Sequence, residues 1–311
     1  LVGNVLAFLA GLVIVALGIR LVADTSGIGR TSEFDQVVNA AAIAAKDDPA
    51  PLIVFTGASF SRNGIDDERL TLALKDAGYN YRVVSLSIEA ASILERDAHL
   101  HQFMKQTGET PAAVFVEVAR EFDTRPAFFF DNSKFSTRAI EQFDVNASLW
   151  TLSGLLDRQC GGTVGCVKDV VFLGAHSALN VLNVGLLSKG EHPSDVDPKR
   201  AFDAHFEPRV DLTPAEIHDG LTTIPDVEPV TGPYWVSEFR LEQRAKLSDD
   251  GVKTVGYYFP PVLSPDDRAY ASGLCLGELD GLPCFIADDP ALLSQLDGSF
   301  WLDDEHLLDP G

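Results

Sequence analysis

The clearest pattern of apolar and polar positions begins at residue 52. Residues 52–55 form an unbroken apolar run, which is typical of a strand covered on both faces of a sheet. Residues 66–77 follow, with acidic side chains in the first turn and leucines further on, and the pattern ends before Gly78. The segment therefore predicts a strand, a tight turn and a helix.

The same alternation continues along the chain. Residues 81–86 predict a second strand, 89–105 a second helix and 112–118 a third strand. Strands that alternate with helices predict a parallel, doubly wound α/β sheet with helices on both faces, a three-layer α/β/α fold. The later elements that we expect are a helix over 235–247, a strand over 252–259 and a short edge strand over 285–287.

The first 21 residues have a different pattern, because Asn4 and Arg20 are their only strongly polar side chains. A helix of that length can cross a bilayer, and its apolar part is longer than the core of a usual signal peptide. We expect a transmembrane anchor in lipid over residues 1–22, a stalk over 23–50 and one folded domain over 51–311. A signal sequence is the alternative.

Two stretches of the expected domain show no clear period, and we interpret them as insertions at about 122–166 and 190–232. Residues 122–148 are aromatic and predict either packing over the sheet or a lid that binds substrate or a partner. Residues 192–230 are rich in proline and aspartate and predict a long excursion over the surface.

The net charge of the chain limits the classes of partner that we expect. Asp and Glu number 46 against 24 Lys and Arg, for a net charge of −22. Binding to phosphate backbones needs clustered basic side chains, so nucleic acid is not an expected partner. The same charge disfavours docking on an anionic lipid surface.

The four cysteines fall into two local pairs, Cys160 with Cys166 and Cys275 with Cys284, and each pair brackets a short loop that contains glycine. Local pairing is the simplest of three possibilities and would place the domain in an oxidising, extracytoplasmic space such as the periplasm. Zinc is the rival interpretation, but neither pair has the C-x-x-C spacing and no histidine is close in sequence. We expect no metal and no cofactor.

Two short motifs at opposite ends of the domain carry candidate chemistry. Gly57-Ala58-Ser59-Phe60-Ser61 follows the first strand, and Asp303-Asp304-Glu305-His306-Leu307 lies near residue 311. A serine hydroxyl needs a base to remove its proton as it attacks a carbonyl. His306 is the candidate base, and Asp303 would fix its tautomer and stabilise the imidazolium.

These two motifs, in this order, resemble the nucleophile block and the closing block of the SGNH (GDSL-type) serine hydrolases, over about residues 51–311. The resemblance implies a flavodoxin-like sheet and a covalent acyl-serine on Ser59. It also implies a likeness to extracytoplasmic members that move acetyl groups on polysaccharides, with acylated carbohydrate as substrate.

The resemblance implies an oxyanion hole in which this chain departs from the family pattern. The N–H groups of Ser59 and Ala90 would donate, with Ala90 at a position where the family has glycine. Ala119 stands where the family has a donating asparagine, and Ala58 stands in place of the usual aspartate. Losing one such donor costs about 10²- to 10³-fold in rate, so either the enzyme is greatly slowed or a neighbour such as Arg120 or Asn63 supplies the donor.

Two functions from different classes remain. One is a membrane-anchored serine esterase or O-acyltransferase that acts on ester groups of envelope carbohydrate. The other is a weakly active or inactive SGNH-like subunit of a larger membrane complex, with other membrane subunits as partners. The three triad residues favour the enzyme, and the altered oxyanion positions favour the subunit.

Overall fold

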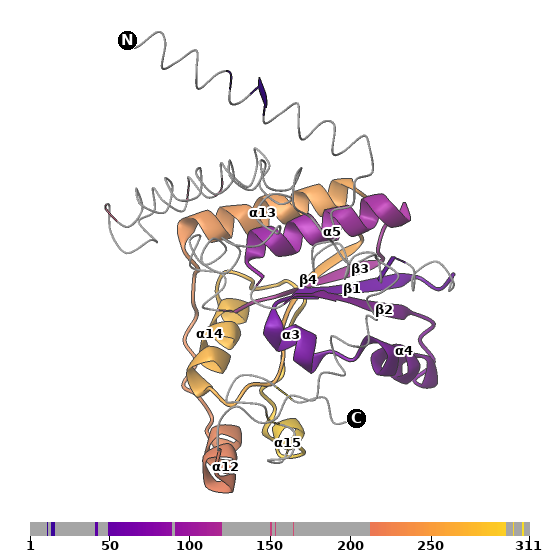
Figure 1. The fold of residues 1–311 in the computed structure, drawn as a ribbon. Coiled ribbons are helices and arrows are strands. Elements are labelled where there is room, and N and C mark those ends of the chain that lie inside the picture. Colours follow the sequence, from indigo (N-terminus) through magenta and orange to yellow (C-terminus); the bar gives the residue numbers. More distant parts are fainter. Residues whose placement is uncertain are drawn as a thin grey trace.

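The fold is that of a computed structural model, drawn in Figure 1. It describes residues 51–88, 91–119 and 212–296, together with single residues and short pieces at 11, 14, 15, 41, 42, 49, 50, 150, 153, 164, 301 and 307. Within these residues the chain forms a five-stranded sheet in which every neighbouring pair is parallel.

The strand order is β2-β1-β3-β4-β5. The sequence pattern predicts all five strands, and the structure confirms them with small shifts of their ends. Their bounds are β1 (Leu52–Gly57), β2 (Arg82–Ser87), β3 (Ala113–Glu117), β4 (Thr254–Phe259) and β5 (Cys284–Ile286). Order along the chain reverses at β1, because β2 pairs on one side of it and β3 on the other.

Helices cover both faces of the sheet, as the alternating pattern predicts (Figure 1). The first face carries α5 (Ile93–Thr107) and α13 (Tyr234–Asp249). The other carries α3 (Ser59–Gly64), α4 (Asp67–Asp76) and α14 (Pro265–Leu276). Two short helices, α12 (Pro214–Thr222) and α15 (Pro290–Leu293), contact each other farther from the sheet.

Local capping explains where several helices begin. The Asp66 carboxylate accepts the Arg69 N–H at 2.8 Å and starts α4. Ser92 and Glu95 form a capping box at the start of α5, and Thr213 and Glu216 form another at the start of α12. Each box satisfies N–H groups that a helix start leaves without a partner in the helix.

Several expected boundaries were wrong. The second helix begins at Ile93, not at residue 89, and α12 lies inside the stretch that we expected to be irregular. The pattern also does not predict α3, α14 or α15. None of the helices among the described residues is long and apolar enough to cross a bilayer. The predicted anchor over residues 1–22 lies outside the described residues except at 11, 14 and 15.

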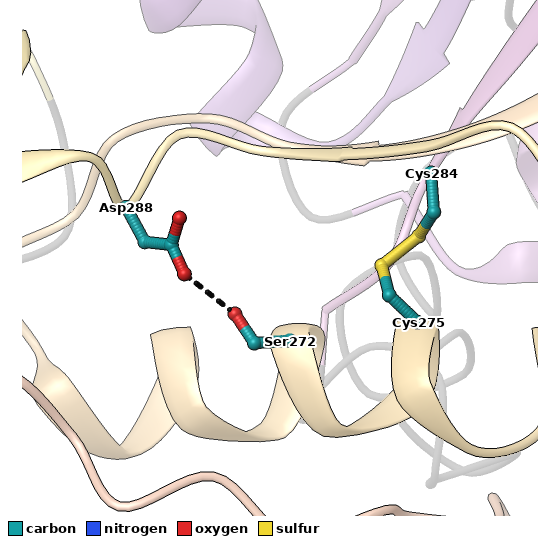
Figure 2. Close-up of a disulfide and its surroundings, with 4 residues drawn as sticks. All are labelled: Ser272, Cys275, Cys284 and Asp288. Carbon is teal, nitrogen blue, oxygen red and sulfur yellow. Dashed lines mark hydrogen bonds between the residues drawn. A yellow bond between two sulfur atoms is a disulfide. The ribbon is translucent and has the colours of Figure 1, made fainter. Parts of the chain in front are cut away.

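The predicted bridge between Cys275 and Cys284 is present, with their Cα atoms 5.8 Å apart (Figure 2). It joins the last turn of α14 to the first residue of β5. On the same helix, the Ser272 hydroxyl donates to Asp288 at 2.8 Å, so α14 is held to the segment around β5 at two points. Cys160 and Cys166 lie outside the described residues.

A buried ion pair holds α13 to the end of α14. Arg240 is 1% exposed, and its Nη1 donates to Glu278 Oε1 at 3.0 Å. The other carboxylate oxygen accepts the Gly232 N–H at 2.8 Å and the Ser237 hydroxyl at 2.7 Å. Because its donors come from a loop and a helix, Glu278 fixes the path of the chain into α13.

Candidate functional site

Ser59 lies at the carboxyl edge of the sheet, where the strand order reverses. It is the first residue of α3, two positions after the last residue of β1, and it is half-buried. In open α/β sheets, ligands bind outside the carboxyl ends of the strands at such a reversal. The fold therefore places the candidate nucleophile in the usual region for a binding site.

The turn before Ser59 depends on a glycine at position 57. A Cβ on Gly57 would lie 2.6 Å from Glu117 Oε2 and would overlap the Ser61 side chain. Real Cβ atoms do not approach that closely, so any larger residue would displace the Ser61 and Glu117 side chains. Close packing thus explains the glycine at position 57.

The carboxylate of Glu117 organises the start of α3. Its Oε2 atom accepts the backbone N–H of Ala58 at 3.1 Å and that of Ser61 at 3.0 Å. The Ser61 hydroxyl donates to the same oxygen. Glu117 is the last residue of β3 and is fully buried, so this contact joins β3 to the turn on which Ser59 lies.

Arg96 of α5 lies on the other side of this carboxylate. Its Nη2 is 3.5 Å from Glu117 Oε1, and both side chains are fully buried. Nη1 donates to the Glu117 carbonyl at 2.7 Å, and Nε donates to the Ala91 carbonyl at 3.0 Å. A buried charge needs a partner and hydrogen bonds, and these contacts supply both.

Tyr258, near the end of β4, completes the network. Its hydroxyl donates to Ser61 Oγ at 2.5 Å. Burial, and next the negative charge of Glu117, raise the pKa of Tyr258 far above its ordinary value. Tyr258 is therefore a neutral donor at every pH that the protein would meet, and the proton of Ser61 is directed at Glu117.

The structure describes only some of the positions expected to form the oxyanion hole. Asn63 lies in α3, four residues after Ser59, so the two share one face of the helix. Ala58 precedes the helix and is fully buried, and Ala119 is buried just beyond β3. Ala90 and Arg120 lie outside the described residues, so their proposed roles stay predictions.

The two other triad residues, Asp303 and His306, also lie outside the described residues. Their neighbours Trp301 and Leu307 are described, and they form an antiparallel bridge with each other. Leu307 approaches α3, because its Cδ1 atom is 4.0 Å from the place where a Cβ on Gly64 would lie. The end of the chain thus returns to the helix that begins with Ser59.

Among the described residues, no group of three or more His, Cys, Asp and Glu side chains is arranged to hold a metal ion. The groups gathered at the carboxyl edge are a serine hydroxyl at a helix start and, beneath it, a network of carboxylate, guanidinium and phenol. Such an arrangement suits nucleophilic chemistry at Ser59 if a base reaches it.

Sequence reasoning assigned no role to Glu117, Arg96 or Tyr258, and it included Ser61 in the motif around Ser59 without giving it a role. One signal was present, since Glu117 ends an otherwise apolar strand. A charged side chain directly after a buried strand lies at the carboxyl edge of a parallel sheet, where sites occur.

No protein-family model matches this chain, and no curated protein matches it.

Proposed function

We propose that this protein is a membrane-anchored serine esterase or O-acyltransferase that acts on ester groups of envelope carbohydrate. Ser59 is the nucleophile, His306 the base, and Asp303 the residue that orients His306. In the first step, His306 takes the proton of Ser59 as the Ser59 oxygen bonds to the acyl carbon, and it gives that proton to the ester alcohol as the bond between this alcohol and the acyl carbon breaks. Water then takes the acyl group in a hydrolase, or a sugar hydroxyl takes it in a transferase.

The position of Ser59 is the observation that carries this proposal. Ser59 begins α3 directly beyond β1, at the reversal of strand order. The approach of Leu307 to Gly64 supports the pairing with His306, because His306 is the preceding residue in the chain. Exposed apolar side chains at Ile14 and Val15 support the anchor.

An accessory subunit with an SGNH-like fold is the second candidate, and one observation favours it. The N–H groups of Ala58 and Ser61, at the start of α3, donate to the protein's own Glu117. Ala119 brings no side-chain donor to the edge of the sheet. An active enzyme then depends on Ser59 N–H, Ala90 N–H and the side chain of Asn63 or Arg120.

Labelling with a fluorophosphonate probe separates the two candidates, because the probe reacts with an activated serine. The full 311-residue chain should label, and Ser59→Ala should abolish the label. Ser272→Ala is a control, since Ser272 is also a partly buried helical serine but lies on α14, where its hydroxyl donates to Asp288. The His306→Ala and Asp303→Ala variants should label far more slowly. A folded wild-type chain that takes up no probe would favour the accessory subunit.

A second measurement addresses the substrate. The wild-type chain should release acetate from an acetylated oligosaccharide, or transfer the acetyl group to an added sugar acceptor, and Ser59→Ala should do neither. Labelling without turnover of any acetylated carbohydrate would keep the nucleophile and reject the substrate class.

A further inference from the structure

We propose that Glu117 is a positioning residue for Ser59: its buried carboxylate holds the turn that presents the nucleophile. This inference rests on the proposed function, because it assumes that Ser59 attacks an ester. Glu117 does not touch the substrate in this account. It acts through the backbone on each side of Ser59.

The contacts of Glu117 bracket the nucleophile. Ala58 directly precedes Ser59, and Ser61 follows it by two residues. The N–H groups of Ala58 and Ser61 donate to the same carboxylate oxygen, at 3.1 and 3.0 Å. The short backbone segment between them is therefore fixed at both ends. Displacing a reacting atom by about 1 Å can cost about 10²-fold in rate, so this restraint matters for catalysis.

The carboxylate is itself held in place. Arg96 lies 3.5 Å from Oε1 and donates to the Glu117 carbonyl, so it fixes both the side chain and the end of β3. The Ser61 hydroxyl, which receives a hydrogen bond from Tyr258, donates to Oε2. Residues from β3, β4, α3 and α5 thus converge on one buried group, and the turn cannot shift without breaking several contacts.

The surroundings of the Glu117 carboxylate leave little room for another side chain and do not suit a neutral amide. Gly57 leaves no room for a Cβ between β1 and this carboxylate. Glutamine at position 117 could accept the two N–H groups through its amide oxygen. Its NH₂ group would then face the Arg96 guanidinium, donor against donor, so the side chain would not keep the native position.

The chain offers a close match to Glu117 for use as a control. Glu278 also accepts a backbone N–H, a serine hydroxyl and an arginine, but it lies between α13 and α14. Glu117→Gln and Glu278→Gln therefore remove similar buried carboxylate–arginine pairs. Both variants should lower the thermal midpoint, while only Glu117→Gln should slow the chemistry of Ser59.

The test measures the rate constant of fluorophosphonate labelling, and kcat and KM for p-nitrophenyl acetate, on the full chain well below its thermal midpoint. We expect Glu117→Gln to lower the labelling rate and kcat by about 10- to 100-fold, with KM within about twofold of wild type. Glu278→Gln should stay within about twofold in all three quantities. Circular dichroism checks that each variant is folded.

Ser61→Ala provides a milder variant, because it removes the hydroxyl that holds Oε2 in place and so loosens the carboxylate to which the Ala58 and Ser61 N–H groups donate. It should lower the labelling rate by about three- to tenfold and should decide the matter if Glu117→Gln does not fold. The inference would be overturned if folded Glu117→Gln labelled at the wild-type rate. If Glu117→Gln does not fold, a wild-type labelling rate in Ser61→Ala would overturn it. It would also be overturned if Glu278→Gln lost as much labelling rate as Glu117→Gln. Failure of the wild-type chain to label would overturn the proposed function and this inference together.

Discussion

Leu307, the residue after His306, packs beside Gly64 of α3, with its Cδ1 atom 4.0 Å from the place where a Cβ on Gly64 would lie. It also packs against a small apolar cluster that includes Trp301 and residues of α12 and α15. Gly64 and Leu307, about 240 residues apart in sequence, are therefore close in space, next to the helix of the candidate nucleophile.

This contact predicts that Leu307→Ala slows the reaction of Ser59. The substitution removes apolar packing that anchors the segment around His306, at a cost of about 1–2 kcal/mol in unfolding free energy for a half-buried leucine. Fluorophosphonate labelling should fall by about tenfold, because His306 would be held less firmly. Leu276→Ala is the control, since Leu276 is 57% exposed and lies at the end of α14. Equal labelling of the two variants would contradict the proposed role of Leu307.

A second prediction concerns Gly57. Gly57→Ala should destabilise the protein by about 1–3 kcal/mol, as overpacking does, because the new methyl group would meet Glu117 and Ser61. It should also slow labelling of Ser59. Gly108 is the comparison, since it has a positive φ of 68° and open space around it. Gly108→Ala should cost about 1 kcal/mol through backbone strain alone and leave labelling unchanged.

A third prediction concerns the bridge between Cys275 and Cys284, whose sequence separation is 9. Closing so short a loop restricts the unfolded chain modestly, so replacing both cysteines with serine should cost about 2.5 kcal/mol. The midpoint of urea unfolding should fall accordingly, and ester hydrolysis should stay at the wild-type level because the bridge joins β5, the edge strand that β3 and β4 separate from β1 in the sheet order β2-β1-β3-β4-β5. A loss of hydrolysis in the folded double variant would show that α14 contributes to the site.

The sequence predicts an element of this fold only where the element is long enough, or apolar enough, to show a pattern. The strands β1 to β4 are predicted because largely buried strands give apolar runs that need no knowledge of their partners, whereas β5 is a three-residue edge strand with a weaker signal. In contrast, α3 has only six residues, too few to show a helical period. The start of α12 does carry a readable signal, Thr213-Pro214-Ala215-Glu216, which is a capping box with proline in the first turn.

The candidate site was predicted less completely, for a physical reason. The motifs pointed to Ser59, which lies at the carboxyl edge of β1 as predicted. The group that fixes its turn, Glu117, is 56 residues from Ser61 in sequence and meets it only because β3 pairs beside β1. Contacts of this kind depend on strand order and register, which local patterns do not contain.

The final prediction is a pair of opposite pH dependences at two carboxylates. Burial alone would raise the pKa of Glu278, but the Arg240 charge and the hydrogen bonds from Ser237 and Gly232 hold it below the ordinary value. A lowered pKa in the folded state gives stability that is fully present above the ordinary glutamate value of about 4.3. That stability is lost as pH falls through the folded pKa. Burial raises the pKa of Asp67 above its ordinary value, despite a hydrogen bond from the Ser85 N–H.

For Asp67 the pH dependence of stability has the opposite sign. As pH rises, the carboxyl group loses its proton at a lower pH in the unfolded state than in the folded state. The free energy of unfolding therefore falls between about pH 3.9 and the raised pKa of the folded state. Urea unfolding from pH 3 to 7 of the wild type, Glu278→Gln and Asp67→Asn measures both effects. The deficit of Glu278→Gln should be largest at pH 6 to 7, about 3–5 kcal/mol for a broken buried pair, and should shrink below about pH 4. Relative to wild type, Asp67→Asn should instead gain stability as pH rises from 3 to 6. If the free energies of unfolding of the two variants, relative to wild type, changed with pH in the same direction, the contacts around Glu278 and Asp67 would not control the pKa of these carboxylates.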